Sequence, residues 1–441
     1  MHSMKKKVKF LVNIFIFLVL SLMLTMWLVS ILYPFSIHVS PLFPLVDIIG
    51  VSSINGSLGG FYLGVGLLLI AYFWRGTKYL KAATILMLAS LCSHIFSLIN
   101  NGFEQGSILM LSITVLAIFA FGWIIKEYPT LRNFMDEVHP DFRKFKFISV
   151  NSKGLWRKRT INRILEKKYT EANIADNIKV ENYEIEGYEG RKIKVEVFQK
   201  KDAIDNAPCM IVYPGGAFWA KPIPSYKYFF NRYINGTGMK VVFEHFTLSL
   251  EAPYPAPPED CYLGTIWAYE NAEMLGINKA KIVLYGISSG GTLVGAVSLM
   301  LRDRNQFKPC FQMLIYPLVA YQMNTASLIK YSGMPVWKED ITSDLFTLYT
   351  KGLKGEFPAY VIPIKAKDFS NLPNAYIEAA EYDCVRDEAE MYAEKLREHG
   401  VEAQFYEVKG AVHGFDILLK SEISKAAFQR RIKILNKVFN E

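Results

Sequence analysis

The sequence predicts two joined parts: an all-α transmembrane domain of four helices, then an α/β domain with a mostly parallel sheet, helices on both faces and a cap segment. Charged residues are absent from four long apolar stretches in the first third of the 441-residue chain. The remainder alternates short runs typical of strands with amphipathic stretches typical of helices. We therefore expect a four-span module at 1–125, a basic juxtamembrane connector at 126–168, and an α/β domain at 169–441 whose cap covers about 317–372.

The four apolar stretches each approach the roughly 20 residues that a helix needs to cross the hydrocarbon core. The first follows a lysine-rich start and so resembles a signal peptide. Its apolar run is too long for one and lacks a clear small-residue cleavage site, so we expect the segment to be retained. The predicted spans are about 10–33, 57–75, 82–99 and 107–125.

Positive charge predicts the orientation of these spans. The lysine-rich start and the loop with Arg75, Lys78 and Lys81 fall on one side, whereas the loops at 34–56 and 100–106 carry no Lys or Arg. We therefore expect a multi-pass protein of the cell membrane with a cytoplasmic N-terminus, and four spans return the chain to the cytoplasm. The five cysteines are odd in number and lack C-x-x-C spacing, which predicts free thiols in a reducing compartment and no zinc site.

Three features next to or within the membrane part have two interpretations each. Gly60 and Gly64 form a G-x-x-x-G pair, which suits packing within the module better than dimerisation. His94 is an ionisable group inside a span, and a neutral histidine bonded between helices is favoured over a functional one. The basic connector at 126–168 is equally well a solvated helical linker or a surface that contacts anionic lipid. Nucleic-acid binding is not expected, because no recognition motif accompanies the charge.

After the connector, the pattern changes to alternating strands and helices. Helical stretches such as 262–274 and 388–399 separate several of the strands, which favours a mainly parallel sheet. The segment 317–372 interrupts this rhythm and would cover the crevice at the strand ends. The expected strands are 192–198, 209–213, 240–243, 281–285, 311–316, 375–379 and 403–407.

The stretch "VLYGISSGGT" at 283–292 indicates a nucleophilic serine. Val283 to Tyr285 would end a buried strand, and the next five residues fit G-x-S-x-G, a sharp strand-to-helix turn that exposes a serine oxygen. This register selects Ser288 as the nucleophile. The following helix would point its N-terminal amides toward the site.

A serine hydroxyl needs a histidine base, and that histidine needs a carboxylate to fix its tautomer. Downstream of Ser288 only His399 and His413 are available, and His399 is well explained as a C-terminal partner of a helix ending before Gly400. His413 lies in a glycine-flanked loop after the last strand and is the expected base. Asp383 follows a strand directly and is the expected acid; the nearby carboxylates Glu381, Asp387 and Glu388 are interpreted as structural.

The remaining requirement is a set of donors for the oxyanion. The loop "PGGA" after the strand at 209–213 supplies Gly215 and Gly216. Their amides, together with the backbone N–H of Ser289, are the predicted oxyanion hole.

With these stretches assembled, residues of about 150–441 resemble the hormone-sensitive-lipase-like branch of the α/β-hydrolases. The resemblance implies an α/β-hydrolase fold and carboxyl-ester hydrolysis through an acyl-enzyme, with no metal and no organic cofactor. It places the catalytic roles on the predicted triad and oxyanion hole: Ser288, Asp383, His413, Gly215, Gly216 and Ser289. Pro214, Ala217, Ile287, Ser289 and Cys384 depart from the family's usual residues, which affects efficiency and substrate preference more than reaction type. The motifs are "YPGGAFW", "FTLSLEAPYPAPPED", "GISSGG", "EYDCVRDEAEMYAEKL" and "VHGF".

The sequence therefore predicts a membrane-anchored serine carboxylesterase that cleaves an acyl or acetyl ester, with the small-molecule or lipid-like ester and the bilayer as its partners. Apolar cap residues such as Met323, Leu328, Met334, Trp337, Leu345 and Phe346 would line an acyl pocket or simply form the cap's core. A peptidase or acyltransferase using the same triad is a second interpretation. A non-hydrolytic ligand sensor is a third, and the presence of both Ser288 and His413 disfavours it.

Overall fold

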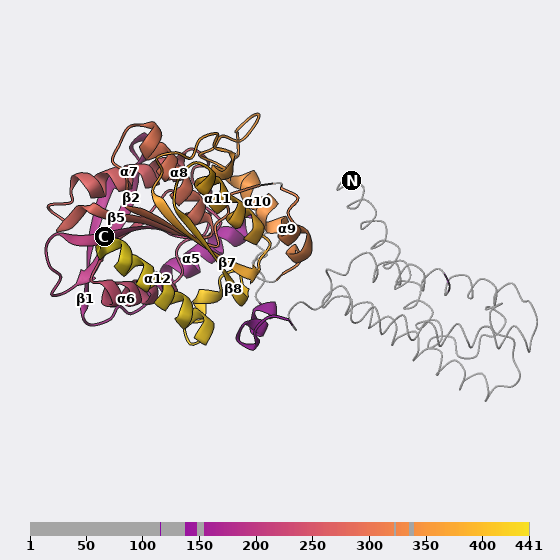
Figure 1. Cartoon of the computed structure of the whole chain (residues 1–441), viewed down its shortest axis with the longest axis horizontal. Coiled ribbons are helices and arrows are strands. Elements are labelled where there is room, and N and C mark those ends of the chain that lie inside the picture. Colours follow the sequence, from indigo (N-terminus) through magenta and orange to yellow (C-terminus); the bar gives the residue numbers. More distant parts are fainter. Residues whose placement is uncertain (1–114, 116–136, 148–153, 322, 335–338, 441) are drawn as a thin grey trace, which may run out of the picture. The chain divides into compact units, whose positions relative to one another are not determined.

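The computed structural model describes residues 115, 137–147, 154–321, 323–334 and 339–440 (Figure 1). Nearly all of these belong to the second of the two compact units into which the chain divides, Phe134–Glu441. Apart from Val115, the four predicted spans lie outside the described residues, as do Gly60, Gly64 and His94. Within the described ranges, no helix has both the length and the apolar character needed to cross a bilayer.

An eight-stranded sheet forms the centre of this unit, in the order β1-β2-β4-β3-β5-β6-β7-β8. The edge strand β1 pairs antiparallel with β2, and β2 pairs antiparallel with β4; every other neighbouring pair is parallel. The prediction of a mostly parallel sheet is confirmed. The strands are β1 (Ile178–Glu186), β2 (Lys192–Lys200), β3 (Ala207–Tyr213), β4 (Lys240–His245), β5 (Ile277–Ile287), β6 (Phe311–Ile315), β7 (Asn374–Tyr382) and β8 (Ala403–Val412).

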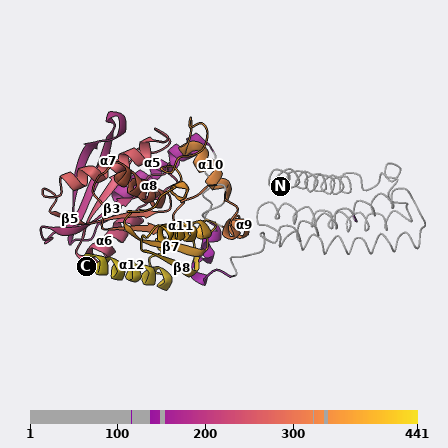
Figure 2. The ribbon, with the colours of Figure 1, turned by 45° about the horizontal axis from the view of Figure 1, so that its top comes forward.

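Helices cover both faces of the sheet. Figures 1 and 2 show α7 and α8 on one side of the strands and α6 and α12 on the other, while α11 contacts β7 and β8. 3₁₀ helices occur at Pro140–Phe147, Tyr188–Gly190, Pro363–Lys365 and Phe415–Ile417. The α-helices are α5 (Leu155–Glu171), α6 (Ser225–Thr237), α7 (Ala256–Glu270), α8 (Ser289–Asp303), α9 (Ala326–Tyr331), α10 (Glu339–Tyr349), α11 (Arg386–Glu398) and α12 (Glu422–Asn440).

The central strands are apolar on both sides because helices cover both faces. All five residues of β6 are buried, as are all but one of β3, and the whole of α8 up to Leu301 is buried between β5 and its neighbours. The expected buried strand before Ser288 is confirmed. It begins earlier, at Ile277, and runs on to Ile287.

The structure contains several elements that the sequence patterns did not indicate. Strand β1 was missed because its sequence, IKVENYEIE, carries charged or polar residues along most of an edge strand, so it lacks an apolar signal. Helices α6 and α12 were not expected. Helix α5 lies partly in the predicted connector and crosses the predicted boundary between residues 168 and 169.

The segment between β6 and β7 contains the range predicted to form a cap, about 317–372. It contains α9 and α10. Leu345 and Phe346 of α10 are buried, as is Met334, which agrees with the interpretation of these side chains as cap core. Trp337 lies outside the described residues.

Candidate active site

Ser288 lies at the tight turn between β5 and α8, where it adopts φ 56° and ψ −120°. A residue other than glycine is strained in this conformation, and such strain persists only where the surroundings hold the backbone in place. Here the Ser288 N–H donates to the carbonyl of Ile315 at 2.9 Å, and the Ser288 carbonyl accepts from the N–H groups of Gly291 and Thr292. The turn predicted from G-x-S-x-G is therefore present.

The two glycines of this turn are required by close backbone approach. A Cβ atom on Gly286 would lie 2.1 Å from the carbonyl oxygen of Gly290, and one on Gly290 would lie 2.0 Å from the carbonyl oxygen of Tyr213. Both distances are far inside van der Waals contact. The motif's spacing therefore follows from the packing of β5, α8 and the end of β3.

The structure brings Ser288, His413 and Asp383 together across three strand ends. His413 Nε2 lies 3.0 Å from Ser288 Oγ, and His413 Nδ1 lies 2.6 Å from Asp383 Oδ2. Asp383 directly follows β7 and His413 directly follows β8, as predicted. All three side chains are buried or nearly so, which keeps water from competing for their hydrogen bonds. This is the geometry of a nucleophile, a base and an orienting carboxylate.

The other carboxylates and the other histidine occupy the structural positions expected for them. Glu381 is in β7, and Asp387 and Glu388 are in the first turn of α11. His399 caps the end of α11, where its Nδ1–H donates to the carbonyl of Lys395 at 2.8 Å.

The loop after β3 does not use Gly215 as predicted. The Gly215 N–H donates to the hydroxyl of Tyr226 at 2.6 Å, so it is already engaged within the protein. Among the described residues, the N–H groups of Gly216, Ala217 and Ser289 have no acceptor. Tyr226 could not be identified from the sequence because it lies in α6, which no pattern indicated.

This loop has an unusual backbone. Gly216, Ala217 and Phe218 all have positive φ values, of 138°, 56° and 58°. Ala217 thus adopts a conformation that favours glycine, although it carries a Cβ. The hydroxyl of Ser289 accepts a hydrogen bond from the Phe218 N–H at 3.3 Å, so this serine also holds the loop through its side chain.

Comparison with known proteins supports a family assignment. A family model described as alpha/beta hydrolase fold matches residues 210–417. An arylesterase of Saccharolobus solfataricus is 30% identical over 296 residues, which cover 65% of this chain and 91% of that protein. The chain belongs to the α/β-hydrolase family of carboxylic ester hydrolases.

Further relatives agree with this assignment. The carboxylesterase NlhH of Mycobacterium tuberculosis is 30% identical over 234 residues, covering 52% of this α/β-hydrolase and 73% of NlhH. The solved structure of a Pyrobaculum calidifontis esterase superimposes with a TM-score of 0.59 at 30% identity, covering 64% of this chain and 92% of that one. The resemblance inferred from the five motifs is thus confirmed at the level of family and fold.

The cap of this α/β-hydrolase packs directly on the loop after β3. The ring of Phe218 stacks on that of Tyr349 in α10, with centroids 3.9 Å apart and planes 11° from parallel. The carbonyl of Tyr349 accepts from the Tyr254 N–H at 2.7 Å. Helix α10 therefore covers the strained loop beside Ser288.

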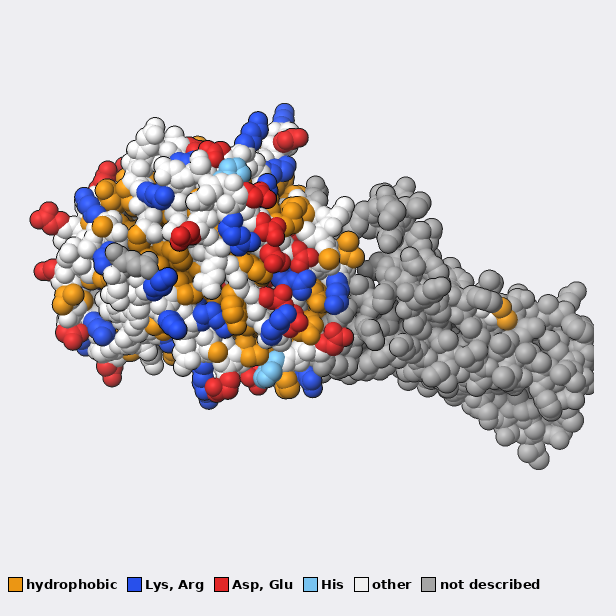
Figure 3. All heavy atoms as spheres, viewed as in Figure 1, with side chains coloured by type: hydrophobic (Ala, Val, Ile, Leu, Met, Phe, Trp, Pro, Cys, Tyr) orange, Lys and Arg blue, Asp and Glu red, His pale blue; other side chains and the backbone are white. Residues whose placement is uncertain are grey.

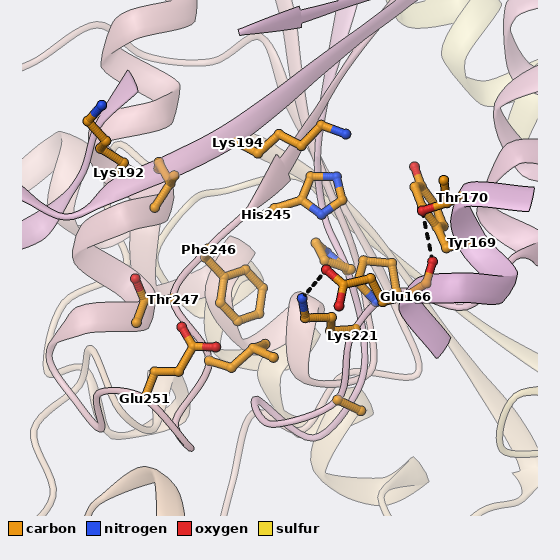
Figure 4. A pocket seen from close by; sticks show the side chains of 15 residues that line it. Glu166, Tyr169, Thr170, Lys192, Lys194, Lys221, His245, Phe246, Thr247 and Glu251 are labelled. Carbon is orange, nitrogen blue, oxygen red and sulfur yellow. Dashed lines mark hydrogen bonds and ion pairs between the residues drawn. The ribbon is translucent and has the colours of Figure 1, made fainter. Parts of the chain in front are cut away.

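A cavity of about 190 Å³ lies beside the same loop, and neither Ser288, Asp383 nor His413 lines it (Figure 4). Its wall includes His245, whose Nε2 lies 2.7 Å from Glu196 Oε2. Burial alone would raise the pKa of Glu196, but hydrogen bonds from His245, Lys194 and Tyr169 outweigh it and lower that pKa to about 2. Glu196 is therefore a charged anchor that joins α5 to the sheet.

A buried charge network lies behind His413. Arg431 of α12 is fully buried and forms ion pairs with Glu378 and, at 2.9 Å, with Asp416. Asp416 also accepts a hydrogen bond from the Tyr316 hydroxyl at 2.6 Å, and the Tyr316 ring lies 4.7 Å from the ring of His413. No sequence motif indicated this network, because Tyr316, Glu378, Asp416 and Arg431 lie far apart in the sequence.

Proposed function

We propose that the chain is a membrane-anchored serine carboxylesterase whose catalytic triad is Ser288, His413 and Asp383. The observation that carries this proposal is the continuous hydrogen-bond path from Ser288 Oγ through both ring nitrogens of His413 to Asp383. Three side chains from separate strand ends would rarely meet in this order for packing alone. The membership of the carboxylic ester hydrolase family supports the same reaction class.

In the proposed reaction, Ser288 Oγ attacks the carbonyl carbon of the ester while its proton passes to His413 Nε2. The protonated imidazole is stabilised by Asp383, and it then gives the proton to the departing alcohol. The C–O bond of the ester breaks and the acyl group remains on Ser288. Water then attacks the acyl carbon while His413 takes its proton. The bond between the acyl carbon and Ser288 Oγ breaks, the proton returns from His413 to Ser288 Oγ, and the carboxylic acid leaves.

The oxyanion formed in these steps would be held by the N–H groups of Gly216, Ala217 and Ser289. This set differs from the sequence prediction because the Gly215 N–H already donates to Tyr226. Ser289 begins α8, so its N–H also carries the favourable end of the helix dipole. Each such donor typically contributes about 3 kcal/mol to transition-state stabilisation.

The predicted four-span module at 1–125 would hold this site at the cytoplasmic face of the cell membrane. The support comes from the sequence, where four charge-free stretches precede the α/β-hydrolase unit and positive charge flanks one side of them. An active site next to a bilayer suits a substrate with an apolar acyl chain. Extraction of membranes with alkaline carbonate tests the anchor, because an integral module stays in the pellet.

The first experiment measures hydrolysis of short and long p-nitrophenyl esters by the purified full-length protein, together with labelling by a fluorophosphonate. Ser288→Ala is expected to lower kcat by on the order of 10⁴-fold or more and to abolish labelling. Ser289→Ala is the matched control, since it removes the adjacent hydroxyl and is expected to keep labelling and to lose less than about tenfold in kcat.

Three outcomes would contradict all or part of the proposal. Labelling that disappears in Ser289→Ala and persists in Ser288→Ala would show that the nucleophile is Ser289 and not Ser288. Folded wild-type protein that neither labels nor hydrolyses any ester would favour the ligand-sensor interpretation. Turnover of an amide or acyl transfer to an alcohol in preference to hydrolysis would keep the triad and change the reaction.

A further inference from the structure

Helix α5 has a surface of one charge sign in its first three turns. Arg157, Arg159 and Arg163 are exposed there, and no Asp or Glu occurs between residues 154 and 165. Large apolar side chains lie among these arginines: Trp156 is 77% exposed and Leu155 is 59% exposed. The face of the molecule in Figure 3 differs, because basic and acidic side chains are interspersed across it.

The charge on α5 runs against the helix's own preference. A helix N-terminus carries partial positive charge and favours acidic side chains. The first turn of α5 has none, its basic residues begin at Arg157, and Gly154 provides no side-chain cap. A local rule broken without a compensating contact inside the protein is a feature expected at functional positions. An anion bound at this end of the helix would compensate the arginines and those first helix amides that have no acceptor among the described residues.

The opposite face of α5 is firmly attached to the α/β-hydrolase unit. Asn162 Nδ2 donates to the carbonyl of Trp219 at 2.8 Å, and Asn162 Oδ1 accepts from the Lys221 N–H at 3.0 Å. The Tyr169 hydroxyl donates to Glu196 at 2.7 Å. The helix is therefore a rigid support, and its basic and apolar side chains are presented outward.

We propose that the exposed face of α5 formed by Leu155, Trp156, Arg157, Arg159, Arg163 and Ile164 binds the surface of an anionic bilayer. Arginine side chains pair with lipid phosphate and carboxylate groups, while tryptophan and leucine enter the boundary between headgroups and acyl chains. A polar partner would leave the exposed Trp156 and Leu155 in water, and an apolar partner would leave the arginines unpaired. A bilayer surface supplies both environments at adjacent depths.

The place of α5 in the chain agrees with this partner. Leu155 follows the end of the last predicted span by about 30 residues, so the predicted anchor would keep the α/β-hydrolase unit, and α5 with it, within reach of a membrane surface. The proposal deepens the anchoring part of the proposed function and rests on it for this proximity. Through Asn162, the same helix holds residues 219–221, which directly follow the strained loop at 216–218. Binding to lipid would thus position the active-site loop relative to the bilayer.

The test places an environment-sensitive fluorophore at Thr160→Cys, which lies between the arginines, in full-length protein reconstituted into vesicles. Cys92 and Cys310 are first replaced by serine, because the other native thiols, Cys209, Cys261 and Cys384, are buried. Vesicles contain phosphatidylcholine alone or phosphatidylcholine with phosphatidylserine. The expected result is a blue shift of the probe's emission with phosphatidylserine, reversed by high salt. The same probe at Met274→Cys, which is 60% exposed, is expected not to shift.

Charge variants complete the design. The triple variant Arg157→Gln, Arg159→Gln and Arg163→Gln is expected to lose the lipid-dependent shift, whereas Lys425→Gln, Lys433→Gln and Lys437→Gln on α12 is expected to keep it. If the probe at position 160 has the same emission in both kinds of vesicle, the proposal is overturned. This holds both for the emission of a probe exposed to water and for that of a probe covered by another part of the chain. Carbonate extraction of the same vesicles scores the anchor separately, so that failure of α5 to bind and failure of the module to insert are distinguishable.

Discussion

At the scale of single residues, the glycine-rich loop at 215–218 has two roles that its sequence does not distinguish: allowing close packing and offering backbone N–H groups to an oxyanion. Gly215 accommodates close packing, since a Cβ there would lie 2.7 Å from the carbonyl oxygen of Ile287, and its N–H is used by Tyr226. Gly216 and Ala217 have positive φ and N–H groups without an acceptor among the described residues. The nearby hydroxyl of Tyr226 therefore decides which amides are left for an oxyanion.

Tyr226→Phe tests this division of roles. The variant removes the acceptor for the Gly215 N–H, and we expect the free energy of unfolding to fall by about 1–2 kcal/mol. We also expect kcat to fall with little change in KM, because the loop that carries the proposed oxyanion donors would be less well held. Tyr183→Phe, which removes a hydroxyl that donates to Glu181 on β1, is the control. If Gly215 itself served the oxyanion, Tyr226→Phe would leave kcat unchanged or raise it.

Ala217→Gly tests the backbone strain in the same loop. An alanine at φ 56° costs roughly 1 kcal/mol that glycine avoids, although glycine gains freedom in the unfolded chain. We expect the variant to be as stable as the wild type or more stable by up to about 1 kcal/mol, measured by denaturant unfolding. Ala220→Gly, two residues after this loop, is the comparison. Equal losses of stability in the two variants would show that the strain at Ala217 is negligible.

At the scale of elements, the first turn of α11, which follows the loop bearing Asp383, is joined to the predicted cap. The Thr325 hydroxyl, which caps α9, donates to Glu388 Oε1 at 2.8 Å, and Asp387 accepts from the Ser327 N–H at 2.6 Å. Burial raises the pKa of Glu388 to about 7, and the neighbouring carboxylates Asp387 and Asp383 add to the increase. The contact between the predicted cap and the first turn of α11 therefore changes charge near neutral pH.

The stability of the protein is expected to depend on pH through Glu388. The pKa of Glu388 is higher in the folded than in the unfolded state. Its contribution to the free energy of unfolding is therefore fully present below about pH 4.5 and is lost as pH rises through about 7, because the buried carboxyl must then carry a charge. Glu388→Gln removes the cost of burying this charge. Relative to the wild type, the variant should therefore gain on the order of 2 kcal/mol more stability at pH 8 than at pH 5. Thermal midpoints of variant and wild type at both pH values check this, with Glu390→Gln on the same helix as the control. Parallel pH dependences would refute the assignment.

Helix α12 and the turn after β8 are joined by buried charge. Arg431→Met leaves Glu378 and Asp416 buried without their main partner, and we expect a loss of about 3–5 kcal/mol in the free energy of unfolding. Since Asp416 follows His413 by three residues, kcat should fall as well. Arg304→Met is the comparison: its pairing with Glu259 is partly exposed, so about 1 kcal/mol or less should be lost. Equal losses in the two variants would contradict a special role for the buried network.

At the scale of the whole molecule, the α/β-hydrolase unit contains its own core and its complete candidate site. The proposed triad, the proposed oxyanion loop and the described part of the predicted cap all lie within Phe134–Glu441. The relatives agree with this division, because the match to the arylesterase covers 91% of that protein but only 65% of this chain. The residues that form the sheet and the candidate site therefore all lie outside the first 133 residues.

We expect a fragment of residues 134–441 to fold cooperatively and to hydrolyse a water-soluble short ester within about threefold of the full-length kcat, because no catalytic group is removed. Its activity on long-chain esters in vesicles should fall more, since the predicted anchor is missing. Near-UV circular dichroism and parallel assays on the two substrates check this. An aggregated fragment, or equal losses on both substrates, would show that the first part of the chain is needed for the fold or the site itself.

The sequence by itself determined the alternation of strands and helices, the register of the turn at Ser288, and the positions of Asp383 and His413 after successive strands. These follow from local rules: apolar periodicity, glycine spacing and the order of residues along the chain. His399 was likewise assigned correctly to a helix end, since capping involves only neighbouring residues.

Only the tertiary structure decided which amides remain free for an oxyanion, which charges lie behind His413, and how α5 is attached. Tyr226, Asp416 and Arg431 act through partners far away in the sequence, so no local pattern marks them. Strand β1 was missed for the same reason, because a charged edge strand is stabilised by pairing with β2 rather than by its own apolar pattern. Periodicity reports burial along one segment, whereas hydrogen-bond partners depend on which segments meet.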